Sequence, residues 1–143
     1  MPPLYLYGAI GLMIVLRVLW PGAGLFPFPR NLAGAVVLLA GIALVLHVDR
    51  ALARHGTTVK PHLETTTLIT TGAFGYSRHP MYLGFALVLA GVAVLLGTAT
   101  PWLVVPAYVL FMDAIFVRSE EAKLSIAFGE TWLRYSTEVR RWI

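Results

Sequence analysis

The chain has 143 residues, of which 58% are hydrophobic and only 13% are charged. Soluble domains carry about 25% charged residues, so this composition excludes a water-soluble domain of this size and indicates a membrane protein. The chain has no cysteine, which excludes disulfides, thiolate metal ligands and a cysteine nucleophile. Its net charge is +4, but the sequence has no basic face lined with aromatic residues, so nucleic-acid binding is not expected.

Four long apolar runs follow one another along the chain. Each has 16 or 17 residues, slightly fewer than the roughly 20 that cross a bilayer, and flanking aromatics or local bilayer thinning make up the difference. Four such runs, with so little polar sequence to cover them, predict an all-α integral membrane protein with about four transmembrane helices in a single domain, residues 1–143. The helices are expected at residues 4–20, 32–48, 81–96 and 102–117.

The basic residues predict the orientation of these helices. Nine of the eleven lysines and arginines lie in the connector 49–80 or after the fourth run, whereas the opposite side holds only Arg17 and Arg30. Because basic residues are retained on the cytoplasmic side of a membrane, we expect both termini and the connector 49–80 to be cytoplasmic.

The polar segments between and after the runs are also informative. Residues 97–101 alone join the third run to the fourth, so these two helices must form a tight antiparallel hairpin. The 49–80 connector is long for a compact protein and rich in Thr, Gly and His, which is typical of a functional loop. In residues 118–143, aromatic and apolar residues recur at helical spacing, which predicts a C-terminal amphipathic helix that lies on the membrane surface or packs under the bundle.

The densest group of chemically active residues lies at the start of the third run. Proline is favoured at the first position of a helix, so Pro80 predicts that His79 is the N-cap and that Arg78 lies just outside the helix. The free N–H groups of the helix end, together with a guanidinium and an imidazole, suit an anion such as a carboxylate or a phosphate. Taken alone, the same three residues also fit an ordinary membrane anchor and an ordinary helix cap.

A second polar group, Glu120 and Glu121, follows the fourth run. Because the third and fourth runs form a hairpin, this pair is expected to lie close to His79 and Tyr82. Adjacent carboxylates at a membrane edge cannot face lipid cheaply, and they can accept hydrogen bonds from ribose hydroxyls or an ammonium group. The alternative is a solvated helix end, paired with the basic residues beside it.

Other polar residues give weaker indications. Asp113 lies inside the fourth run, and a carboxylate within the membrane is either functional or paired structurally with a tyrosine hydroxyl or Arg118. His47, His55 and His62 are eight and seven residues apart, with helix breakers between them. This spacing does not match a ligand set, so no metal is expected.

Glycines recur in the second and third runs. Gly34 and Gly41 lie in the second run, and Gly84 and Gly91 lie in the third. Small residues allow close approach of membrane helices, so close helix packing is favoured over ligand contacts at these positions.

Two motifs frame the third and fourth runs. The first, in residues 56–84, ends in R-H-P-M-Y-L-G, and the second, in residues 118–135, reads R-S-E-E-A-K-L-S-I-A-F-G-E-T-W-L-R-Y. Their combination resembles the isoprenylcysteine carboxyl methyltransferase-like and phospholipid methyltransferase family of bacterial integral membrane enzymes. One departure precedes Arg78, where the family's usual T-G-P-Y-R-Y-S-R reads T-G-A-F-G-Y-S-R. Ala73 and Gly75 thus replace a proline and a bulky basic residue, which loosens this approach to the site.

The resemblance implies a fold and an activity. Members of this family bind S-adenosylmethionine in a pocket at the cytoplasmic ends of the last helices, so it implies a methyltransferase of the bacterial cell membrane with a cytoplasmic active site. In the carboxyl methyltransferases an arginine of this kind orients the acceptor carboxylate, which implies catalytic roles for Arg78 and Glu121 at the reacting centre. The motif positions that the resemblance assigns to cofactor binding are His79, Pro80, Tyr82, Gly84, Glu120 and Glu121.

The residue types agree with methyl transfer. S-Adenosylmethionine is already an activated methyl donor, so the protein mainly has to align an acceptor with the sulfonium. Neither a nucleophilic side chain nor a metal is required. We expect the methyl group to go to a carboxylate or an amine of a lipid-like or prenylated small molecule that reaches the site from the bilayer.

Two other functions keep the same architecture. Membrane reductases of the sterol-reductase type resemble this fold and bind a nicotinamide dinucleotide, whose extra phosphates call for more basic residues than Lys60 and Arg78, the two in residues 55–80. A non-enzymatic scaffold or partner subunit is the third possibility, and it predicts that Arg78 and the glutamate pair tolerate alanine.

Overall fold

The computed structural model describes residues 2–55 and 67–143 of the chain. Its long elements are α-helices: α1 (Pro2–Leu19), α2 (Ala33–Arg54), α3 (Pro80–Leu96), α4 (Val104–Met112) and α5 (Arg118–Glu138). α1, α2 and the helical run that contains α4 and α5 are long and apolar enough to cross a membrane, and α3 is a shorter apolar helix. The predicted class, an all-α integral membrane protein, is therefore confirmed.

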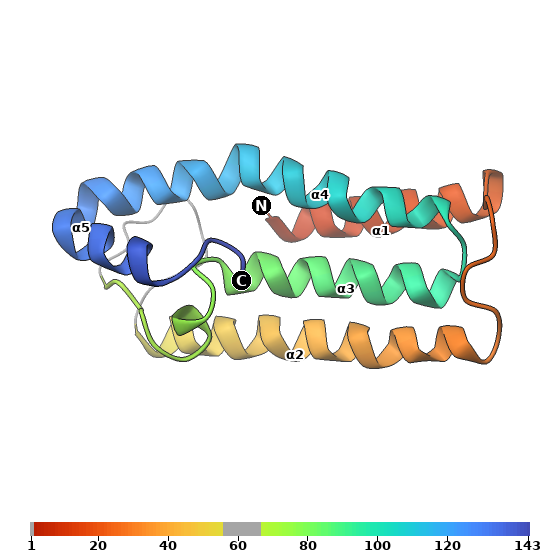
Figure 1. The fold of residues 1–143 in the computed structure, drawn as a ribbon, viewed down its shortest axis with the longest axis horizontal. Helices are drawn as coiled ribbons and strands as arrows, with labels where there is room; N and C mark the ends of the chain where they lie inside the picture. The colour runs from red at the N-terminus through yellow and green to blue at the C-terminus, as the bar shows by residue number, and fades with distance from the viewer. Residues whose placement is uncertain (1, 56–66) are drawn as a thin grey trace.

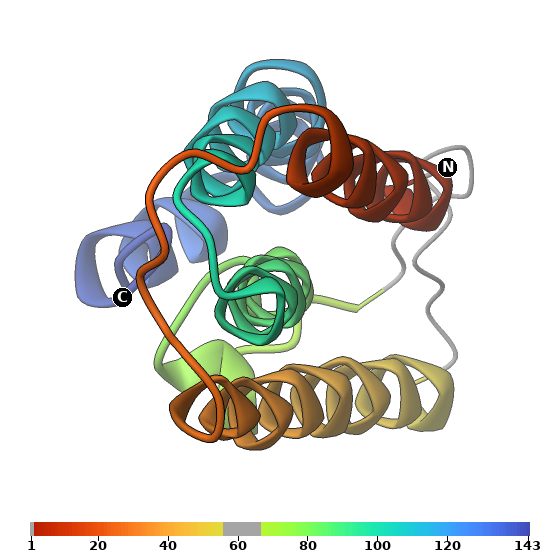
Figure 2. The same ribbon diagram turned by 90° about the vertical axis from the view of Figure 1, so that its right-hand side faces the viewer.

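α3 occupies the centre of the bundle. It is flanked by α2 on one side and by α1 and α4 on the other (Figure 1, Figure 2). A helix that is apolar all round is buried, and α3 carries no charged residue, so Leu89 and Ala93 are fully buried. The outer helices instead expose large apolar side chains such as Val36, Leu39 and Leu110, as expected of surfaces that face lipid.

α2 and α3 pack with their backbones in close contact. A Cβ atom added at Gly41 would lie 2.8 Å from the carbonyl oxygen of Gly84, and one added at Gly34 would lie 2.5 Å from that of Gly91. These distances leave no room for a side chain, which is the use of small residues expected between membrane helices. The predicted packing role of the four glycines is therefore confirmed.

The third and fourth runs form the tight hairpin that their short connector predicts. α3 ends before Gly97, which has a φ of 73°, and a new helical turn, η3 (Thr100–Leu103), leads into α4. The connector from α1 closes over the same end, because the N–H groups of Leu25 and Ala99 donate to the carbonyls of Gly97 and Ala23. At the other end of the bundle, the start of α3 consequently lies beside the run that continues from α4.

Two helices extend beyond the apolar runs that predict them. α2 continues to Arg54 rather than ending at residue 48, because its last turns are polar but still helical. α4 continues through a π-helical turn, η4 (Asp113–Val117), directly into α5. Gly129 then takes a φ of 49° inside α5, a conformation that favours glycine, and the chain folds back (Figure 1). α5 ends at Glu138, so the helix predicted over 118–143 stops short, and residues 139–143 are not helical.

Candidate cofactor site

α3 begins at the residues that the R-H-P motif predicts. Pro80 is the first helical residue and His79 is the N-cap. The backbone N–H of His79 donates to Oγ of Ser77 over 3.2 Å, and Ser77 donates to the backbone carbonyl of Arg141 over 3.2 Å. These hydrogen bonds hold the backbone just before α3, and the side chain of His79 is buried.

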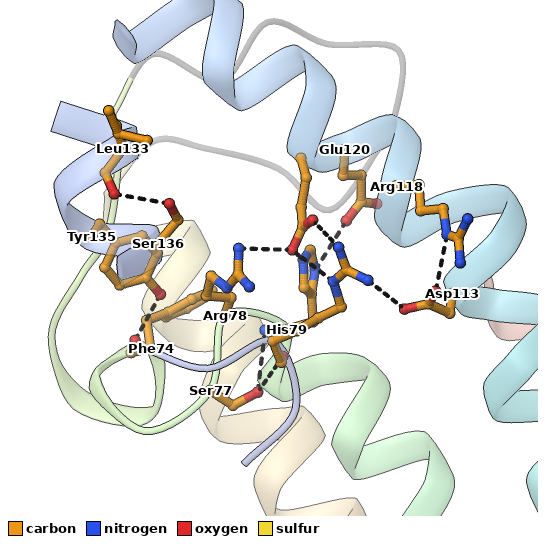
Figure 3. Close-up of polar contacts among 12 residues, drawn as sticks. Phe74, Ser77, Arg78, His79, Asp113, Arg118, Glu120, Leu133, Tyr135 and Ser136 are labelled. Atoms are coloured by element: carbon orange, nitrogen blue, oxygen red, sulfur yellow. Dashed lines mark hydrogen bonds and ion pairs between the residues drawn. The ribbon is translucent and has the colours of Figure 1, made fainter. Parts of the chain in front are cut away.

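The two glutamates of α5 lie against the His79 ring, and Figure 3 shows Glu120 beside it. Nε2 of His79 lies 3.3 Å from Oε1 of Glu121, and Nδ1 lies 3.6 Å from Oε2 of Glu120. Tyr82, in the first turn of α3, donates its hydroxyl to Oε1 of Glu120 over 2.7 Å. The expected proximity of the glutamate pair to His79 and Tyr82 is therefore confirmed.

Arg78 contacts the same carboxylate. Its Nη1 lies 3.1 Å from Oε1 of Glu121, and its guanidinium carbon lies 5.8 Å from the centre of the Trp132 ring, within the range of a cation–π contact. Its Nε is buried and has no hydrogen-bond partner among the described residues. Because a buried donor without an acceptor is costly, this nitrogen is a candidate to bind an anionic oxygen of a ligand.

Arg141 also contributes to the site, although its position in the sequence does not predict this. Its Nε donates to Oε1 of Glu121 over 3.1 Å and its Nη2 donates to Oε2 over 2.6 Å, and its Nη1 lies 3.4 Å from Oδ1 of Asp113. Asp113 also accepts from Nε of Arg118 over 3.1 Å, which is one of the pairings that the sequence left open. In the sequence, Arg141 is only one more basic residue on the predicted cytoplasmic side, so no local signal distinguishes it.

The folded-back part of α5 holds the segment that precedes α3. The Tyr135 hydroxyl donates to the backbone carbonyl of Phe74 over 2.7 Å, and Phe74 belongs to a short helical turn, η2 (Gly72–Gly75). Tyr135 and Trp132 are buried, whereas Leu133 is exposed. One face of the predicted amphipathic helix therefore packs under the bundle.

The charges around Glu121 are closely paired. Burial opposes ionisation of this carboxyl, but the hydrogen bond from Arg141 and the positive charges of Arg78 and Arg141 outweigh it and hold the pKa of Glu121 below its usual range. The hydrogen bond to Glu121 in turn raises the pKa of Arg141. Both groups lie beyond the last apolar run, which ends at Val117. Glu121 is consequently ionised at neutral pH.

Some residues singled out from the sequence lie away from this cluster. Gly84 packs against α2, so its contact with a cofactor stays a prediction. Pro80 is buried in the first turn of α3. His55 is the C-cap of α2, with Nδ1 2.8 Å from the backbone carbonyl of Ala51, and His62 lies outside the described residues.

These features define a class: a helical protein of the membrane with a charge-paired polar site where its central helix meets the helix after the last span. The sequence model of the phospholipid methyltransferase family matches residues 29–131, more than half of the chain. The chain belongs to that family, whose members are membrane methyltransferases that use S-adenosylmethionine.

One relative has no assigned activity of its own. The chain is 35% identical over 63 residues to an uncharacterized protein of Haemophilus influenzae. The match covers the whole of that protein and 44% of this chain. This similarity therefore adds a relative but no information on the methyl acceptor.

Proposed function

We propose that this chain transfers the methyl group of S-adenosylmethionine to a carboxylate or an amine of a lipid-like or prenylated acceptor. One observation carries the proposal. At the start of α3, His79 lies between two glutamates, and Arg78 contacts one of them. Membership of the phospholipid methyltransferase family supports the identity of the methyl donor.

The residues of the cluster fit the polar groups of the donor. S-Adenosylmethionine carries ribose hydroxyls and an ammonium group that can donate to carboxylates, and a carboxylate that can accept from a guanidinium. Glu120, held by Tyr82, is suited to the first kind of group. The buried Nε of Arg78, which lacks an acceptor within the described part of the chain, is suited to an anionic oxygen of either substrate.

Each residue then has a role in aligning the reactants. When bound, S-adenosylmethionine supplies a methyl group that is already activated as a sulfonium. His79, Tyr82, Glu120 and Glu121 hold this donor, with Pro80 setting the start of the helix on which Tyr82 lies. Arg78, kept in place by Glu121, orients the acceptor toward the methyl group. Such alignment is a main source of rate acceleration when no covalent step on the enzyme is needed.

The acceptor enters from the bilayer. α1, α2 and α4 expose apolar side chains along the bundle, so a hydrocarbon chain can lie beside them in lipid while its polar end reaches Arg78. For an acceptor with a long apolar chain, each buried methylene contributes about 0.8 kcal/mol to the free energy of membrane binding. The bilayer therefore concentrates this kind of acceptor at the site.

Calorimetric titration of the purified protein in detergent with S-adenosylhomocysteine tests the donor site. We expect wild-type protein to bind, and the double variant His79→Ala, Glu121→Ala to bind about 100-fold more weakly, because hydrogen bonds to charged groups contribute about 1.5–3 kcal/mol each. The matched control is His47→Ala, Glu138→Ala, which removes the same functional groups from exposed positions.

Three results would contradict this proposal. They are absence of heat from folded wild-type protein, equal binding by the two double variants, and thermal stabilisation by a nicotinamide dinucleotide but not by S-adenosylhomocysteine. The last result would favour the reductase.

A labelling experiment tests the proposed cytoplasmic orientation of the site. Because the chain has no cysteine, single cysteines can be introduced at exposed positions at opposite ends of the bundle, Ala23→Cys between α1 and α2, and Thr137→Cys at the end of α5. Basic residues such as Arg50 and Arg54 lie at the same end as the site, so we expect a membrane-impermeant maleimide to label position 23 in intact spheroplasts. Position 137 should be labelled only after permeabilisation, and the reverse pattern would contradict the orientation.

A further inference from the structure

We infer that Arg141, in the non-helical segment after α5, is a positioning residue that sets the orientation of the Glu121 carboxylate for binding of the methyl donor. The inference rests on the proposed function. It assigns to the segment 139–143 a direct part in the site, through contacts with both the start of α3 and the start of α5.

The backbone of this segment is attached to the start of α3. The carbonyl of Arg140 accepts from the backbone N–H of Arg78 over 3.0 Å, and the carbonyl of Arg141 accepts from the hydroxyl of Ser77 over 3.2 Å. Two successive carbonyls are thus bound by the two residues that precede His79. The position of the Arg141 side chain is consequently set relative to the R-H-P motif.

The guanidinium of Arg141 binds the Glu121 carboxylate through two nitrogens. Its Nε and Nη2 contact both carboxylate oxygens of Glu121, and its Nη1 reaches Asp113. Two parallel N–H···O bonds restrict a carboxylate to one orientation, which a single ammonium cannot do. Asp113, itself paired with Arg118, fixes the guanidinium from the far side.

Glu121 needs such a partner because several charged or polar groups compete for its carboxylate. It is contacted by Arg78 and His79 from the start of α3 and by Arg141 from the segment after α5, while the second carboxylate, Glu120, lies next to it in α5. If Arg141 did not hold it, the Glu121 carboxylate would be free to turn away from His79, which is one of the residues proposed to hold the donor.

The experiment measures binding of S-adenosylhomocysteine to wild type, Arg141→Gln, Arg141→Lys, Glu121→Gln and the double variant Glu121→Gln, Arg141→Gln. We expect Arg141→Gln to weaken binding on the order of ten-fold, and Arg141→Lys, which keeps the charge but not the two-pronged contact, to weaken it less. Because Arg141 acts through Glu121, the double variant should bind no more weakly than Glu121→Gln alone. The matched control is Arg140→Gln, which removes an exposed guanidinium while the backbone carbonyl of residue 140 remains.

The pH dependence of binding gives a second readout that a purely structural role would not move. Arg141 helps to hold the pKa of Glu121 below its usual range, so in Arg141→Gln that pKa rises, and binding should be lost at a higher pH on acidification than in wild type. The profile of Arg140→Gln should coincide with that of wild type.

The outcomes separate the inference from the proposed function. Wild type that binds, with Arg141→Gln and Arg140→Gln equal in affinity and in pH profile, would overturn the inference alone. The inference would also be overturned if the loss of affinity in the double variant equalled the product of the losses in Glu121→Gln and Arg141→Gln. Arg141 would then act independently of Glu121. Folded wild type that does not bind would overturn the proposed function together with this inference. If Arg141→Gln does not fold, Arg141→Lys provides the same comparison with Arg140→Gln.

Discussion

Leucine in place of Gly91 should prevent the close packing of α2 on α3 and lower the thermal stability of the protein strongly. A Cβ atom at position 91 would lie 2.7 Å from Cα of Leu38 and 2.8 Å from the carbonyl oxygen of Gly34. Both are backbone atoms of α2, so the helices must separate to admit a side chain. Overpacking of this severity costs about 3 kcal/mol, which for a domain of this size corresponds to a fall in melting temperature of about 10 °C.

The measurement is thermal melting in detergent, followed by fluorescence-detected size exclusion. Gly11→Leu is the matched control, because Gly11 lies in an exposed part of α1 and a Cβ atom there meets nothing within 4 Å. We expect the control to melt close to wild type. Equal melting temperatures for Gly91→Leu and Gly11→Leu would show that the two helices do not pack as described.

Lysine in place of Arg78 should reduce methyl transfer by about 100-fold or more while the protein remains folded. The guanidinium contacts Glu121, lies over Trp132 and keeps a buried Nε for a ligand. A lysine ammonium is a single point charge and cannot bind Glu121 and orient an acceptor carboxylate in a fixed geometry at the same time. Loss of alignment of about 1 Å is enough for a 100-fold decrease in rate.

An assay of this prediction does not require the acceptor to be identified. Membranes that contain each variant are incubated with S-adenosylmethionine labelled in its methyl group, and the label in the lipid extract is counted. The matched control is Arg50→Lys, at an exposed position of α2, which should transfer label like wild type. If Arg78→Lys membranes incorporate label at the wild-type rate, Arg78 does not face the reacting centre.

Binding of S-adenosylhomocysteine to the same variant separates two uses of Arg78. A residue that orients the acceptor should affect methyl transfer far more than affinity for the donor product. We therefore expect Arg78→Lys to lose transfer while it binds S-adenosylhomocysteine within a few-fold of wild type. A parallel loss of both would assign Arg78 to the donor instead.

Much of this architecture follows from local sequence. The apolar runs predict the helices because a bilayer demands continuous apolar helical stretches, and the five residues 97–101 leave a hairpin as the only connection of α3 to α4. Because of that hairpin, the sequence alone predicts that Glu120 and Glu121 lie close to His79 and Tyr82. Pro80 likewise marks the start of α3, because a proline at the first helical position lacks only an N–H that would have no partner.

What the sequence did not predict depends on a bend of the backbone and on side-chain pairing. The fold-back at Gly129 reverses the direction of α5, and nothing local distinguishes this glycine from those that pack between α2 and α3. Because of that reversal, Arg141 reaches Glu121 and Asp113 across separations of 20 and 28 residues. A periodic pattern reports which face of a helix is apolar, but the direction of the chain beyond a glycine is decided by the contacts that it makes. The place of Arg141 in the site was therefore decided by the tertiary structure alone.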